Sequence, residues 1–204
     1  MQSMSETLAS LKLAWSEISD QCLSVLGSEL HYQAMIYHCL RTTGRVPIDQ
    51  IGMNVKMYVD SPVSTKFREL DQRKHKDFRG GFEPIPDVAI FGPAVKGDWR
   101  RRNRLETLVS CLMAIEVKAS ERAGSRLRPG EIREDISKLS AHREEAISRG
   151  SDFLPVMLVI DSARESKERM TPTGLESARN YALESEVGFL YASPVTQIVQ
   201  LDIE

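Results

Sequence analysis

The chain lacks the features that identify several common classes of protein. It has only three cysteines, an odd number with no CxxC pair, which argues against a disulfide framework and against a zinc cluster. No apolar run approaches the 18 residues that indicate a membrane-spanning helix. The first residues have neither the positive charge nor the apolar stretch of a secretory signal. We therefore expect a cytoplasmic protein with no membrane association.

Common catalytic motifs are missing as well. There is no G-x-x-x-x-G-K-[ST] phosphate loop, so the apolar run that ends at Asp161 does not indicate a nucleotide hydrolase. The four histidines share no metal-ligand spacing, and no Ser-His-Asp or His-Cys arrangement is visible. The net charge is −2, so the chain as a whole has no basic field that would attract nucleic acid. A nucleic-acid site would have to depend on local patches.

The hydrophobic pattern predicts one α/β domain. With 204 residues, 41% hydrophobic and 27% charged, the chain can form a core without covalent staples. A helix between two strands implies a parallel crossover and hence a layered α/β fold. We expect helices over 4–18, 20–41 (with Asp20 as its N-cap), 131–149 and 173–186, strands over 50–59, 88–91, 108–118, 154–160 and 187–191, and a polar loop over 92–107.

Two of the expected strands carry acidic residues. Pro86-Asp87 precedes the strand 88–91, and Glu116-Val117-Lys118 ends the strand 108–118. Alternate residues of a strand point to the same face, so Glu116 and Lys118 should lie side by side, with Val117 directed to the other face. The neighbouring residues on both faces are apolar, which indicates a central, buried strand. Charges there are costly unless they are paired or bind a metal ion, so this pattern predicts a metal site.

The residue types suit magnesium and phosphodiester hydrolysis. Two carboxylates, Asp87 and Glu116, would hold Mg²⁺, or Mn²⁺ as a substitute, together with several waters. The backbone carbonyl of Val117 would add a third oxygen. Lys118 cannot bind the cation, but its ammonium group can orient an attacking water or offset charge that develops on the phosphate.

The motif resembles that of the PD-(D/E)XK nuclease superfamily, in which Pro-Asp is followed at a distance by Glu-x-Lys. In this chain Asp87 and Glu116 are 29 residues apart. The expected order of elements across 20–160 also resembles that family's core: helix, three strands, helix, strand. The resemblance implies a restriction-endonuclease-like fold, a mixed central sheet flanked by helices. We expect a single domain over 1–204, with an N-terminal helical extension at 1–19, the core at 20–160 and a further helix and strand at 161–204.

The resemblance also implies a function and a set of roles. It implies Mg²⁺-dependent cleavage of DNA, or less often RNA, with Asp87 and Glu116 as metal ligands and Lys118 as the catalytic lysine. Glu29 resembles the acid of the first core helix that assists metal binding in this family. Asp135 and Lys138 resemble the polar active-site neighbours on the helix that follows the lysine. The helix 131–149 has no Gln-xxx-Tyr signature of the RecB-like branch, so the subfamily is not assigned.

Local basic patches could contact phosphates despite the acidic net charge. Arginine forks match phosphate oxygens, and Trp99 could either stack on a base or anchor its loop. Lys138 is a further candidate contact. The patches are Arg100, Arg101, Arg102 and Arg104; Arg126 and Arg128, with Arg122 nearby; and Arg73, Lys74, His75 and Lys76.

Each of these patterns also has a plainer interpretation. A Glu-x-Lys at a strand end is commonly a solvated pair, and Glu29 and Asp135 near helix starts can simply face the helix dipole. Our first hypothesis is a DNA nuclease, expected as a homodimer because one site cuts one strand. The second is a catalytically inactive nucleic-acid-binding or assembly module of the same fold. The third is a partner-binding protein without a nucleic-acid role.

Overall fold

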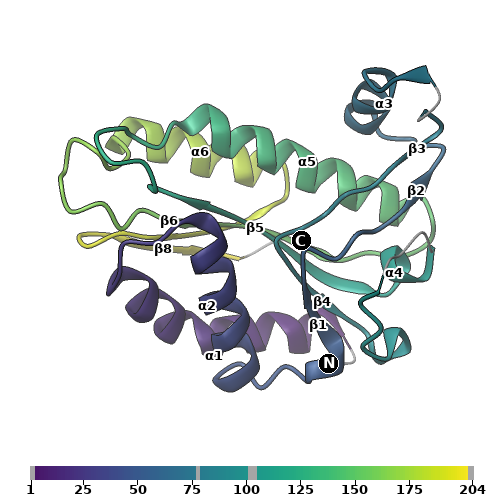
Figure 1. Cartoon of the computed structure of the whole chain (residues 1–204), viewed down its shortest axis with the longest axis horizontal. Coiled ribbons are helices and arrows are strands. Elements are labelled where there is room, and N and C mark those ends of the chain that lie inside the picture. The colour runs from purple at the N-terminus through teal and green to yellow at the C-terminus, as the bar shows by residue number, and fades with distance from the viewer. Residues whose placement is uncertain (1–2, 77–78, 101–104, 202–204) are drawn as a thin grey trace.

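The computed structural model describes residues 3–76, 79–100 and 105–201, and it has a mixed α/β fold (Figure 1). Short 3₁₀ turns lie at Ile48–Gln50 and Pro93–Val95. The helices are α1 (Met4–Leu23), α2 (Glu29–Thr42), α3 (Thr65–Gln72), α4 (Leu105–Val109), α5 (Pro129–Ile147) and α6 (Pro172–Glu184). The strands are β1 (Ile51–Met53), β2 (Val59–Asp60), β3 (Gly81–Phe82), β4 (Val88–Phe91), β5 (Cys111–Ala119), β6 (Leu154–Ile160), β7 (Gly188–Ala192) and β8 (Gln197–Gln200).

Six strands form one open mixed sheet in the order β1-β4-β5-β6-β7-β8. The pairs β1–β4, β4–β5 and β7–β8 are antiparallel, whereas β5–β6 and β6–β7 are parallel. Helix α5 connects β5 to β6, as the sequence predicted for strands joined by a helix. The mixed α/β class with flanking helices is therefore confirmed.

Helices cover both faces of the sheet (Figure 1). The alternation of β5 sends Ile115 and Val117 into the core under α1 and α2, and Ala114 into the core under α5 and α6. By the same alternation, Glu116 and Lys118 face the α5 side. None of the described helices combines the length and the apolar character that a membrane crossing requires.

The segment between β1 and β4 leaves the main sheet. Strands β2 and β3 pair in an antiparallel ribbon of their own, with α3 between them in the chain (Figure 1). We call residues 55–86 the arm. The fully buried carboxylate of Glu145, on α5, accepts hydrogen bonds from the backbone N–H groups of Val63 and Ser64 at 3.2 and 2.7 Å. Arg149 donates both to that carboxylate and to the backbone carbonyl of Asp60. The arm is therefore fastened to α5.

Some element boundaries differ from the sequence-based predictions. The single strand expected over 50–59 is wrong, because Asn54 takes a left-handed φ of 52° and ends β1. Residues 59–60 then pair in the arm instead of the main sheet. The prediction that a helix starts at Asp20 is also wrong. Helix α1 continues to Leu23, and α2 begins at Glu29, where the Ser28 side chain caps it.

The central strand is shorter than predicted at its start. It begins at Cys111 rather than at residue 108, because α4 occupies 105–109. Part of the loop expected over 92–107 is thus helical. A last strand, β8, was not predicted, and it extends the sheet beyond β7.

Candidate active site

Asp87 and Glu116 meet on neighbouring strands. Strands β4 and β5 are antiparallel with Val88 opposite Ile115, so Asp87, one residue before β4, comes opposite Glu116. The Oδ2 atom of Asp87 accepts a hydrogen bond from the backbone N–H of Val117 at 2.7 Å. The structure therefore brings the two predicted acids together on the face of the sheet that α5 covers.

The Val117 carbonyl lies on the same edge of β5 as Asp87. In a strand, the N–H and C=O of one residue point toward the same neighbouring strand, and the Val117 N–H points to Asp87. The Val117 carbonyl is thus directed to the same side as its N–H, and its role as the third oxygen ligand stays a prediction.

Burial raises the pKa of both acids. The pKa of Asp87 is raised to about 6, because the cost of burial outweighs the hydrogen bond from Val117 and the attraction of Lys118. The pKa of Glu116 is raised well above its usual range, first by burial and then by the negative charges of Asp87 and Asp135. Because it is costly to ionise both carboxylates at once, a bound cation would stabilise their charged forms.

Lys118 is held between two further carboxylates. Its Nζ lies 2.9 Å from Oδ2 of Asp135 and 3.3 Å from Oε2 of Glu29. Asp135 also pairs with Lys138, at 2.8 Å. Burial lowers the pKa of Lys118, but the hydrogen bonds and charges of Asp135 and Glu29 raise that pKa by more, so the ammonium form is favoured.

Glu29 is brought into the site from the first turn of α2. It is the first residue of that helix, where a negative charge also suits the helix dipole. Its carboxylate is paired with Lys118, and its negative charge contributes to the raised pKa of Asp87. A role as a metal ligand stays a prediction, whereas its contact with the predicted catalytic lysine is direct.

The residues present fit a hard divalent cation. Within the described residues, no three His, Cys, Asp or Glu side chains are grouped so as to hold a metal ion. Mg²⁺ does not need such a group, because it is usually held by one or two carboxylates and keeps several waters. The neighbourhood has four carboxylates and two ammonium groups, which leaves a formal excess of negative charge. Asp87, Glu116 and the Val117 carbonyl could supply the oxygen ligands.

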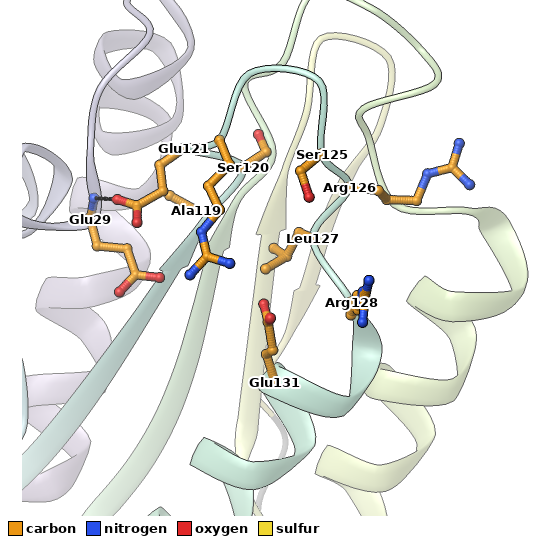
Figure 2. Close-up of a pocket in the computed structure, with 10 residues that line it drawn as sticks. Glu29, Ala119, Ser120, Glu121, Ser125, Arg126, Leu127, Arg128 and Glu131 are labelled. Carbon is orange, nitrogen blue, oxygen red and sulfur yellow. Dashed lines mark hydrogen bonds between the residues drawn. The ribbon is translucent and has the colours of Figure 1, made fainter.

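A polar cavity of about 170 Å³ lies at the end of β5, where Ala119 and Ser120 follow Lys118 in the chain. Figure 2 shows the residues that line it. The loop from β5 to α5 brings Arg126 and Arg128 to its rim, with Arg128 directly before the first turn of α5. The Glu121 carboxylate accepts a hydrogen bond from the Glu29 backbone N–H at 3.0 Å and so ties this loop to α2. The two predicted arginine contacts are thus exposed at the same end of the sheet as the lysine.

The other predicted contacts are less closely tied to the site. Arg100 is exposed and pairs with Asp98 at 3.0 Å. Trp99 packs against Phe91, with ring centroids 5.2 Å apart, so it anchors its loop as one of the two interpretations proposed. Arg101, Arg102 and Arg104 lie outside the described residues.

Sequence reasoning missed the contacts that depend on tertiary structure. No local pattern around Glu121 indicates that its side chain accepts a hydrogen bond from the start of α2, because Glu29 lies 92 positions away in the chain. Glu145 likewise fastens an arm that was not predicted.

Comparisons with protein-family models, with curated proteins and with solved structures each find no match for this chain.

Proposed function

We propose that this protein is a metal-dependent nuclease of the restriction-endonuclease-like fold that hydrolyses phosphodiester bonds, most readily in DNA. One observation carries the proposal: Asp87 and Glu116 face each other across two strands, and Lys118 follows on the same face. Apart from the arm and α4, which lie between these elements in the chain, the order α2, β1, β4, β5, α5, β6 supports the fold, because it repeats the helix, three strands, helix and strand of that family.

The residues divide the chemistry between them. Bound Mg²⁺ would supply a Lewis acid that polarises the phosphoryl oxygen and lowers the pKa of a bound water. Asp87, Glu116 and the Val117 carbonyl would bind this ion. Lys118 keeps its proton, so it can orient the attacking water and offset negative charge in the transition state. Asp135 is a positioning residue that holds the ammonium group in place.

Basic side chains provide contacts for the rest of the substrate. Arg126 and Arg128 lie at the rim of the cavity beyond Lys118, and Lys138 lies on α5 beside Asp135. Such contacts give an affinity that falls as salt rises. Duplex cleavage would need a second copy of the chain, because each copy carries one such site.

A cleavage assay tests the proposal. Supercoiled plasmid, linear duplex, single-stranded DNA and RNA are incubated with Mg²⁺, Mn²⁺ or EDTA. We expect metal-dependent cleavage that is lost in Asp87→Asn, Glu116→Gln and Lys118→Ala. Glu134→Gln is the control, because Glu134 is an exposed acid on α5 that pairs with Lys66 at 2.8 Å. Cleavage that persists unchanged in both Asp87→Asn and Lys118→Ala would overturn the proposal.

A second candidate is a DNA-binding or assembly module without hydrolytic activity. It is favoured by one observation, namely that Lys118 is already engaged by two carboxylates. Salt-sensitive DNA binding with no cleavage in any divalent metal would identify this module.

A further inference from the structure

A second pocket lies between the arm and α5, directly beside the acidic pair. It has a volume of about 260 Å³. The arm contributes Phe82 and Ile85, α5 contributes Leu139 and His142, and Glu116 lies at the boundary with the candidate active site. The pocket is smaller than the usual range for drug-sized ligands, so it suits one small ring system.

The arm wall of this pocket is aromatic and apolar. Phe82 is partly exposed and packs on the buried ring of Phe67, with centroids 4.4 Å apart, and the Nζ atom of Lys74 lies 5.1 Å from the centroid of the Phe82 ring. Ile85 is 41% exposed, although it is a large apolar residue. A flat ligand that takes the place of the Lys74 ammonium group over this ring would stack on Phe82, next to the exposed aliphatic side chain of Ile85.

The charges around this pocket disfavour an anion. Three acids, Glu83, Glu116 and Asp135, and one ammonium group, Lys138, line it. Outside this lining, Lys56 pairs with Glu83 and Lys118 pairs with Asp135, so these cations face the acids. His142 adds no positive charge at neutral pH, because burial lowers its pKa to about 3. Its Nε2 atom is buried and has no hydrogen-bond partner within the described part of the chain. A phosphate therefore fits this pocket poorly, because its lining has three acids and no arginine, whereas the cavity beyond Lys118 has three arginines beside three glutamates.

We propose that the pocket between the arm and α5 receives a single unpaired nucleobase while the adjoining phosphate lies at Glu116 and Lys118. The inference rests on the proposed nuclease function and narrows its substrate to single-stranded, mismatched or locally opened DNA. Phe82 would stack on the base, and the acids would accept hydrogen bonds from exocyclic amino groups of adenine, cytosine or guanine. Extruding a base costs least where it is already unpaired, which gives the preference for such substrates.

The test measures binding in EDTA, so that cleavage does not interfere. The probes are a single-stranded oligonucleotide, a matched duplex and the same duplex with one mismatch, each with 2-aminopurine at successive positions. We expect the single strand and the mismatched duplex to bind more tightly than the matched duplex. One 2-aminopurine position should change its fluorescence on binding.

Variants of the arm test the role of the aromatic wall. Phe82→Leu keeps an apolar side chain but removes the flat ring, so it should weaken binding by roughly 5- to 150-fold, the range that stacking on an aromatic side chain implies. Phe82→Tyr should retain both affinity and the fluorescence change. Ile85→Ala is the second variant, since this exposed residue can be truncated without disturbing the fold, and Ile147→Ala is its matched control, 54% exposed at the end of α5.

The outcomes separate this inference from the proposed function. Equal binding of matched and mismatched duplex, or a Phe82→Leu protein that binds like Phe82→Tyr, would overturn the base pocket even if the enzyme cleaves DNA. If Phe82→Leu unfolds the arm, Ile85→Ala decides: affinity equal to that of Ile147→Ala also overturns it. Conversely, a position-specific fluorescence change without cleavage in any metal supports the pocket and rejects the nuclease.

Discussion

Lys118 and Asp135 form an ion pair, with Nζ of the lysine 2.9 Å from Oδ2 of the aspartate, across the space between β5 and α5. The Asp135 side chain is only 8% exposed, and it pairs with Lys138 as well. One carboxylate thus positions two ammonium groups beside the acidic pair. This links the strand that carries the candidate catalytic residues to the helix that covers them.

Asp135→Asn is expected to slow cleavage about 10- to 100-fold, the usual effect of losing a group that orients an active-site residue. The amide keeps the shape but removes the charge, so it lowers the pKa of Lys118 and loosens its position. Single-turnover rates across pH and DNA affinity in EDTA measure the effect. The rate should fall with little change in affinity, and its alkaline limit should move to lower pH. Wild-type rates at every pH would contradict the role of Asp135.

Asp87→Asn is expected to stabilise the metal-free protein near pH 7. The native carboxyl group binds its proton more tightly than the unfolded one, because its pKa is raised to about 6. The native state therefore loses stability as pH rises from about 4 to about 6, by about 3 kcal/mol in full. The amide can still accept the Val117 N–H bond without this penalty.

Thermal unfolding with and without Mg²⁺ measures this change. In EDTA the unfolding midpoint of Asp87→Asn should lie above that of the wild type at pH 7. At pH 4 the two midpoints should lie closer together. Added Mg²⁺ should raise the midpoint of the wild type and leave the variant unchanged, because only the wild type binds the ion. A lower midpoint for the variant in EDTA would show that Asp87 serves stability and not a cation.

Local periodicity predicted the central part of this site. Glu116 and Lys118 share a face because strand alternation depends only on neighbouring residues, and the apolar residues around them predicted the buried strand. The division of 50–59 between two sheets was not predictable in the same way. Its alternating pattern continues across Asn54, where the left-handed φ ends β1, and the long-range pairing of β2 with β3 then places 59–60 outside the main sheet.

The helix boundary near residue 28 had a local signal that the sequence analysis did not use. Gly27-Ser28 is a typical break and cap, and the Ser28 hydroxyl accepts the His31 N–H. In contrast, the polar contacts that surround Lys118 come from α2 and α5, which are distant in sequence. Such contacts follow from packing, so the sequence could suggest candidate residues but not their pairing.

Glu145→Gln is expected to destabilise the protein by about 2–4 kcal/mol, the opposite sign to Asp87→Asn. Burial raises the pKa of Glu145, but hydrogen bonds from Ser64, Val63 and Arg149 lower that pKa by more, so the native state favours the carboxylate. Replacing it leaves Arg149 without its buried partner and weakens the attachment of the arm. Because the folded pKa is lowered, this stabilisation is present at neutral pH and is lost on acidification.

Hydrogen exchange locates the effect of Glu145→Gln. The amides of Val63 and Ser64, which donate to Glu145, should lose protection, and amides in β6 should change only as far as global stability falls. Glu144→Gln is the control, an exposed acid one position earlier on α5. Equal loss of protection in the two variants would show that Glu145 does not fasten the arm.

His142→Leu is expected to make the protein less sensitive to acid. The imidazole is buried, with the ring centroids of Phe153 and Phe67 at 4.7 and 6.4 Å, and burial lowers its pKa to about 3. Below about pH 6.5 this histidine is protonated in the unfolded chain but stays neutral in the native state. The free energy of unfolding therefore falls by about 1.4 kcal/mol for each pH unit of acidification from this residue alone. Leucine removes the titrating group and the buried Nε2 that has no partner in the described residues, so little stability should be lost at pH 7.

Urea unfolding at pH 7, 6 and 5 should show a shallower decline of stability for His142→Leu than for the wild type, whereas His38→Gln, at an exposed histidine, should follow the wild type. Parallel declines for all three proteins would mean that the imidazole is protonated in the folded state.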